Sequence, residues 1–298
     1  MKPCSLYGAF AVMSSVALIS APLHANADEF IGFGQAAAPG SWALETFPVF
    51  QHTGPNSNTV YSSIEPAYFT ETGFTETHRD QFELWAAGSP GYSNTHGVPG
   101  GSAFGFASPN LAVEYYFNVL VPDADQPVGS PGYKTFWTSP TLFVVFPNGS
   151  SKSAGYGAGA NQYSYGLNVG NYLQNGKIGI TFNPIELYYA GRNLNATDIG
   201  NGQLEKLRGG LSLTLMDVAA GYQVRDDLFL GIHHAYDIYS WKGSDFAEER
   251  EGKIGPSFTY LGLARYGLYV SGNVNFDYYT SSNLKHSISV TMSISKTL

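Results

Sequence analysis

Cysteine is almost absent from this chain, since Cys4 is the only one among 298 residues. This count excludes a disulfide framework within the chain. Cys4 lies ahead of the N-terminal apolar run and lacks the small apolar residues that precede a lipoprotein cysteine, so a lipid anchor is not expected either. The fold must be held by other means, and a closed, hydrogen-bonded barrel is one of them.

Charge is also scarce: 13% of the residues are charged, and 15 basic residues stand against 23 acidic ones. This acidic balance argues against nucleic acid as a partner. Hydrophobic residues make up 43% of the chain, yet beyond the N-terminus no apolar run is long enough for a transmembrane helix. The apolar residues are spread by alternation, which favours strands.

The N-terminus has the three parts of a secretory signal. Lys2 supplies the charged start, an apolar run covers residues 6–19, and small residues occupy positions 25–27. A spanning helix needs about 20 residues, more than this run contains. We therefore expect residues 1–27 to be a signal peptide that is removed on export, and residues 28–298 to form a single domain.

The last predicted strand, residues 286–296, alternates without a break between apolar and small hydroxyl side chains. The two faces are Ile288, Val290, Met292 and Ile294 against Ser287, Ser289, Thr291, Ser293 and Ser295. The same alternation recurs over residues 176–187 and 267–278. Strands with one apolar and one polar face, repeated in an exported chain, are typical of a transmembrane β-barrel with a polar interior.

Twelve segments read as strands, an even number, as single-chain bacterial barrels require. They are residues 42–52, 60–70, 79–87, 111–121, 134–146, 163–173, 176–187, 208–224, 227–240, 253–263, 267–278 and 286–296. The 21 Tyr and 19 Phe suit the aromatic girdles of such a barrel. The predicted fold class is all-β, an antiparallel transmembrane β-barrel of about twelve strands; the alternative is a soluble β-sandwich or jelly roll.

The links between predicted strands alternate in length in the second half of the chain. They are tight at residues 174–176, 225–227 and 264–266, and long at residues 147–162, 189–207 and 241–252. Short and long links alternate in this way when both chain ends lie in the periplasm, because the periplasmic turns of such barrels are short and the external loops are long. Residues 88–110, rich in glycine, are predicted to form the longest external loop, one that can fold inward; the link 122–133 does not obey the parity.

The alternation of side chains along each predicted strand assigns some of them to the lumen. The lumen-lining candidates are Lys177, Thr181, Asn183, His233, Asp237, Ser271, Asn273, Asn275, Asp277, Ser289, Thr291 and Ser293. They are mixed in charge, so they predict passage or binding of small polar or amphiphilic solutes without strong ion selectivity. The alternative is that these groups only bond between strands in a closed barrel.

Catalytic chemistry is not predicted. His286 and Ser287 are adjacent on a strand and point to opposite faces, so they cannot act as base and nucleophile. His233 and Asp237 share a face but are separated by roughly 13 Å of strand. The acidic residues between 245 and 251 match no metal loop and read as a solvated external loop. We expect no enzyme activity, no cofactor and no metal.

Segments near the C-terminus resemble a known family. Gly252–Tyr260 contains Gly255-Pro256 and is followed by a tight turn and the asparagine-containing strand Gly267–Asn275, and Tyr222–Leu230 crosses a short acidic turn. In these features the chain resembles the outer-membrane proteins of the MetA-pathway phenol-degradation family. The resemblance implies a transporter-like barrel associated with uptake of aromatic or other hydrophobic compounds.

The sequence therefore predicts an outer-membrane channel for passive uptake of small solutes, aromatic or hydrophobic ones among them. The alternative is a plugged structural or surface-recognition barrel whose long external loops contact partners. Expected partners are outer-membrane lipid, small solutes and the outer-membrane assembly machinery. That machinery reads a C-terminal aromatic residue in many barrels, whereas this chain ends in Leu298.

Overall fold

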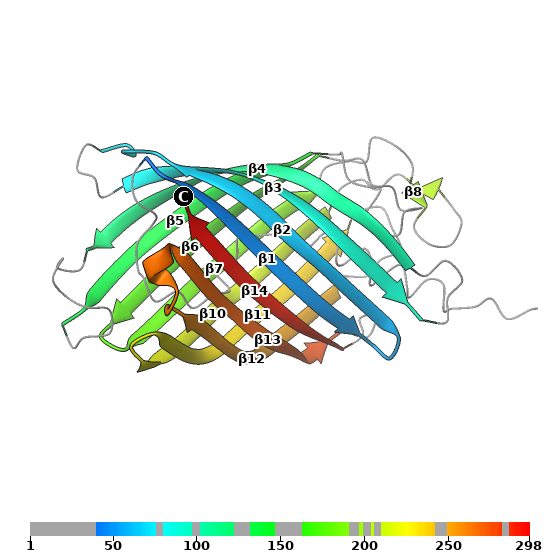
Figure 1. Ribbon diagram of the computed structural model, residues 1–298. Coiled ribbons are helices and arrows are strands. Elements are labelled where there is room, and N and C mark those ends of the chain that lie inside the picture. Colours follow the sequence, from blue (N-terminus) through cyan, green and yellow to red (C-terminus); the bar gives the residue numbers. More distant parts are fainter. Residues whose placement is uncertain are drawn as a thin grey trace, which may run out of the picture.

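Twelve strands close into an antiparallel barrel in the computed structural model (Figure 1). The structure describes residues 40–75, 80–96, 102–121, 132–146, 163–190, 197–198, 204–205, 210–241, 249–281 and 286–298. Pairing between the first and last strands completes the barrel, so each of the twelve strands has two neighbours. The predicted fold class is confirmed.

Each predicted strand corresponds to one strand of the barrel. Their bounds are β1 (Trp42–Thr53), β2 (Ser57–Phe69), β3 (Asp80–Thr95), β4 (Ser102–Leu120), β5 (Lys134–Val145), β6 (Ser164–Asn175), β7 (Ile178–Ala190), β10 (Gly210–Arg225), β11 (Leu228–Trp241), β12 (Glu249–Tyr260), β13 (Leu268–Thr280) and β14 (Ser287–Thr297). Two short strands, β8 (Thr197–Asp198) and β9 (Leu204–Glu205), pair separately. Among the described residues, no helix is long and apolar enough to cross a membrane.

The shortest connections between the described strands lie at one end of the barrel, although at the other end three residues, 54–56, link β1 to β2. We call the end where β1 begins and β14 finishes the proximal end, and the opposite end the distal end. At the proximal end, two residues link β6 to β7 and two link β10 to β11. Gly176, in the first of these turns, has a φ of 57°, which explains the Asn-Gly sequence there. Two of the three predicted tight links are confirmed, whereas the third, at residues 264–266, lies within a seven-residue link between β12 and β13 that contains a 3-10 helix over Ala264–Tyr266.

The predicted loop over residues 88–110 is wrong. β3 continues to Thr95 and β4 begins at Ser102, and the two strands pair as far as Asn94 and Ser102. The glycines of this region take part in the ladder, where Gly91 faces Gly105. A ladder is made by backbone groups, so glycine residues can take part in it although they lack side chains. The other predicted long loops, and residues 1–39 with the predicted signal, lie largely or wholly outside the described residues.

Alternation places apolar side chains outside and polar ones inside the barrel. The outward residues of β11, for example, include Leu230 and Ile232, whose side chains are about half exposed, while His233 and Asp237 of the same strand are buried. Exposed aromatic residues gather near both ends, among them Trp42 and Tyr266 proximally and Tyr165 and Tyr189 distally. The surface thus has the apolar band and aromatic girdles that lipid favours.

Register shifts interrupt the alternation in several strand pairings, including those of β7 and β10. In β7, Asn183 is buried, Pro184 and Ile185 are both exposed, and Glu186 is buried again. In β10 the register shifts between Leu215 and Val218 around Met216, whose φ is 53°. Each irregularity is a β-bulge, which inserts one residue and moves the following side chains to the other face. The bulge in β7 turns Glu186 into the barrel, a position that strict alternation does not give.

Candidate functional site: the inner wall of the barrel

The inner wall carries most of the predicted lumen residues. Nine of them are buried there: Thr181, Asn183, His233, Asp237, Ser271, Asn273, Asn275, Thr291 and Ser293. Asp277 and Ser289 share this face and are half-buried. Lys177 does not lie on the wall, because it forms the turn before β7 with Gly176 and its side chain is exposed. The strand begins one residue later than Lys177, so that prediction is corrected.

His233 is the centre of a hydrogen-bonded network on this wall. Its Nε2 lies 2.8 Å from Asp217 Oδ1, and its Nδ1 lies 2.7 Å from Asn275 Oδ1. Asn275 in turn donates from Nδ2 to Asn273 Oδ1 over 2.8 Å. Both ring nitrogens therefore face acceptor oxygens, an arrangement that a doubly protonated imidazole satisfies. The partner carboxylate is that of Asp217, and Asp237 lies further along the strand, as the spacing predicted.

Gly255 allows the His233 network to cross a strand. It is the partner of His233 in the pairing of β11 with β12, and Asn275 lies on β13 beyond it. A Cβ atom at Gly255 would come within 1.7 Å of the Val274 carbonyl oxygen. Because glycine has no side chain, the imidazole reaches over β12 to the Asn275 amide. The network thus joins side chains of β10, β11 and β13 across the intervening strand β12.

A second polar cluster lies near the distal end. Thr214 Oγ1 donates to Asp237 Oδ1 over 2.6 Å, and Lys253 Nζ lies 2.9 Å from Asp237 Oδ2. The same ammonium group lies 2.5 Å from Glu251 Oε1. One lysine is therefore held between two carboxylates on adjacent strands. The predicted lumen residue Asp237 is thus part of an ion-paired group.

The inner wall also carries acidic residues that were not among the lumen-lining candidates predicted from the sequence. They are Glu45, Glu65, Glu83, Glu114, Glu186, Asp217 and Glu251, all buried or half-buried on the inner face. The sequence of β3 does indicate an inward Glu83, because Gln81 and Glu83 alternate with the apolar residues Phe82 and Leu84. The expectation of a wall mixed in charge is corrected, because carboxyl groups predominate on it in the described strands.

Eight inner side chains, one from each of eight consecutive strands of the barrel, form a row in which each residue is the cross-strand partner of the next. We call this set the polar rung: Glu83, Glu114, Thr141, Asn168, Glu186, Thr214, Asp237 and Glu251. Glu83 is the fourth residue of β3 from the proximal end, and Glu251 is the third residue of β12 from the distal end. The rung thus passes from the proximal part of β3 to the distal part of β12.

Aromatic side chains form an arc beside the proximal part of the polar rung. The ring centroids of Phe69 and Tyr116 are 6.2 Å apart, those of Tyr116 and Trp137 are 5.3 Å apart, and those of Trp137 and Tyr172 are 5.8 Å apart. We call these four residues the aromatic arc. Tyr116 also lies beside the carboxyl groups of the cross-strand pair Glu83 and Glu114. Apolar rings and carboxyl groups thus meet at one place on the wall.

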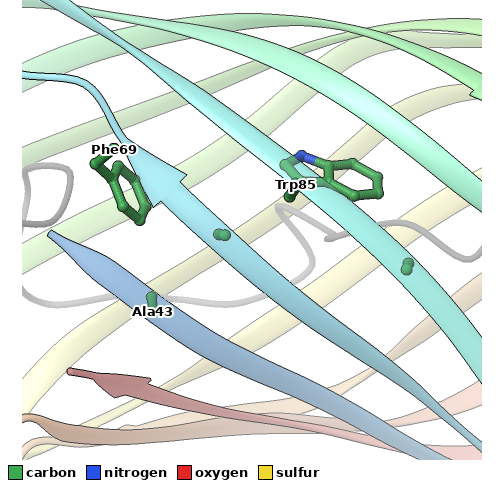
Figure 2. Close-up of a cluster of buried hydrophobic side chains, with 5 residues drawn as sticks. Ala43, Phe69 and Trp85 are labelled. Carbon is green, nitrogen blue, oxygen red and sulfur yellow. The ribbon is translucent and has the colours of Figure 1, made fainter. Parts of the chain in front are cut away.

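A small apolar cluster continues the arc across β1, β2 and β3. It consists of Ala43, Ala67, Phe69, Trp85 and Ala87, and Figure 2 shows Phe69 and Trp85 on adjacent strands. The pair Glu45 and Glu65 lies on one side of this cluster and the pair Glu83 and Glu114 on the other. An apolar patch between two carboxyl pairs suits a solute that has an apolar body and a polar group.

Some buried polar atoms of the wall make no hydrogen bond. They include Trp85 Nε1, Asn110 Oδ1, Asn168 Oδ1 and both side-chain polar atoms of Asn183. Such groups cost free energy unless water or a solute bonds to them. Within the described ranges, no three His, Cys, Asp or Glu side chains are grouped to hold a metal ion. These atoms are therefore buried polar groups of the wall for which the described residues supply no partner.

Comparison with known proteins adds a structural likeness. No family model and no curated protein matches the chain. The fold is similar to that of an outer membrane channel from Pseudomonas putida F1, with a TM-score of 0.69 and 10% identity over 90% of this chain and 99% of that chain. The transport unit of the autotransporter AIDA-I from Escherichia coli has a TM-score of 0.49 and 11% identity, over 98% of both chains. The NanC porin has a TM-score of 0.45 and 10% identity, over 86% of this chain and 100% of that chain. At these identities the likeness concerns the fold alone.

Proposed function

We propose that the protein is an outer-membrane channel through which small solutes pass without covalent chemistry. The observation that carries the proposal is the division of the barrel into an apolar outer surface and a polar inner wall. In lipid, only a closed barrel satisfies the backbone of strands, and this barrel closes between β1 and β14. The similar fold of the Pseudomonas channel supports the same class of protein.

Aromatic or hydrophobic compounds are the solutes that we propose. The aromatic arc and the apolar cluster give the inner wall a surface on which a ring can pack. The resemblance to the MetA-pathway phenol-degradation family points to the same solutes. Offset and edge-to-face ring contacts contribute about 0.5–1.5 kcal/mol each, enough to favour aromatic solutes over sugars of similar size.

Export and orientation belong to the same proposal. Removal of residues 1–27 would leave a chain that begins just before the proximal end of β1. The proximal end has the two-residue turns, so we place it in the periplasm. Mass spectrometry of the protein purified from outer membranes measures the cleavage site, and a mass that retains residues 1–27 would contradict this part of the proposal.

Planar bilayer recording tests the channel itself. The purified protein should give discrete ohmic current steps, and a small aromatic solute added to one side should shorten or block them. A protein that is folded by its circular dichroism spectrum but gives no steps would overturn the proposal.

A plugged recognition barrel is the second candidate, and one observation favours it. Even small inner side chains such as Thr181 and Thr259 are almost fully buried, with relative exposures of 1% and 0%. Such burial fits an interior without a wide water path. The recording separates the two candidates, since a plugged barrel stays silent at every voltage.

A further inference from the structure

The polar rung presents an oxygen-bearing side chain from every strand that it crosses. Five of its members are carboxyl residues, namely Glu83, Glu114, Glu186, Asp237 and Glu251. The others are the amide of Asn168 and the hydroxyls of Thr141 and Thr214. Neighbouring strands lie about 4.8 Å apart, so one oxygen site follows the next within a short step. The rung is therefore a track of acceptor groups between the two ends of the barrel.

The rung already holds one cationic group. Lys253 Nζ lies between the carboxylates of Asp237 and Glu251, at 2.9 and 2.5 Å. Two adjacent carboxylates of the rung are thus close enough to share a single ammonium ion. This contact occupies the distal part of the rung, where a solute that enters from the distal end would meet it first.

One hydrogen-bond acceptor on the rung, the amide oxygen of Asn168, is buried and has no donor. Asn168 is 7% exposed, and its Oδ1 accepts no hydrogen bond. Its cross-strand partners on the rung are Thr141 and Glu186. An amide oxygen that is buried beside a carboxyl residue is stabilised by a cation or by an N–H donor, and an anion gains nothing there.

The inner wall as a whole is acidic in the described strands. Its carboxyl residues are Glu45, Glu65, Glu83, Glu114, Glu186, Asp217, Asp237, Glu251 and Asp277. The described basic side chains on the wall are Lys253 and His233, and each is paired with a carboxylate of the wall. The remaining described lysines and arginines are exposed: Lys134, Lys177, Arg225, Arg250, Arg265 and Lys296. Where these carboxyl groups are ionised, they attract cations to the wall and repel anions from it.

We propose that the polar rung makes the channel selective for cations, and that its organic solutes are protonated amines with an aromatic ring. The ammonium group steps along the carboxyl and amide oxygens, and the ring packs on the aromatic arc, where Tyr116 adjoins Glu83 and Glu114. A tyrosine face also attracts a cation directly. Aromatic acids are repelled by the same carboxyl groups. This inference rests on the proposed channel function and names the charge of its solutes.

Reversal potentials across a KCl gradient test the selectivity. The wild-type protein should pass K⁺ in preference to Cl⁻. Glu114→Gln removes one carboxyl group from the middle of the acidic wall and should lower the K⁺/Cl⁻ permeability ratio roughly twofold to fivefold. Lys253→Met removes the competing ammonium group and should raise the ratio. The matched control is Asp227→Asn, at a partly exposed turn residue that pairs with Arg225 outside the lumen, and it should leave the ratio unchanged.

Benzylamine and benzoate test the organic solute, because they differ mainly in the sign of their charge. Benzylamine should interrupt the K⁺ current and benzoate should not, and Glu114→Gln should weaken the benzylamine block several-fold. Equal block by both compounds, a preference for Cl⁻, or identical ratios for Glu114→Gln and Asp227→Asn would overturn the inference while the channel function stands. A folded wild-type protein that carries no current would overturn the channel function and the selectivity together.

Discussion

Single residues decide how tightly the strands of this barrel approach one another. Gly255 lies so close to β13 that a Cβ atom would meet the Val274 carbonyl oxygen, a backbone atom that cannot rotate away. Gly255→Ala should therefore lower the free energy of unfolding by about 1–3 kcal/mol, the usual cost of overpacking. It should also separate His233 from Asn275. A urea titration of the purified protein measures the loss.

A second glycine, Gly88, provides the control for the substitution of Gly255. A Cβ atom at Gly88, also a strand residue, would meet no atom within 4 Å. Gly88→Ala should then be neutral or stabilise the fold by up to about 1 kcal/mol, because alanine loses less conformational freedom on folding. If both substitutions had the same effect, the close approach at Gly255 would not be the cause.

Single strands show how far alternation predicts structure. Over β14 the predicted facing agrees with the structure at Thr291 and Ser293, because side chains of a regular strand alternate strictly. The inward Glu186 was not predictable in this way, since the bulge at Pro184 and Ile185 changes the parity before it. Nor was the pairing through Gly91, since glycine-rich sequence is typical of loops and only the neighbouring strand shows that it continues the ladder.

The facing of β14 carries a prediction about the membrane. Val290 points outward and Ser289 inward, and both are half-buried. Val290→Arg places a charge against lipid and should lower the free energy of unfolding in vesicles by about 2–4 kcal/mol if the site lies near the midplane. Ser289→Arg places the same charge on the polar wall and should cost less. Equal losses in a urea titration would contradict the assigned orientation of this strand.

The whole molecule depends on a contact between its two ends. β1 and β14 are separated by most of the chain, and their pairing turns an open sheet with two edges into a barrel with none. Sequence predicted an even strand number that permits closure, but the pairing itself is a long-range contact that no local pattern encodes. Closure also defines the inner wall, since the polar rung and the His233 network have an inside only when the sheet is closed.

The scarcity of cysteine makes closure directly testable. Phe50 and Val290 are partners in the ladder that joins β1 to β14. Cross-strand partners have Cα atoms about 4.5–5.5 Å apart, a range that a disulfide can bridge. Phe50→Cys combined with Val290→Cys should form an intramolecular disulfide on mild oxidation, seen as a faster band on a non-reducing denaturing gel. Phe50→Cys combined with Phe276→Cys, which lies one strand further on, should not cross-link. Cross-linking of the second pair alone would mean that β1 pairs with β13 in place of β14, and with it that the barrel does not close as described.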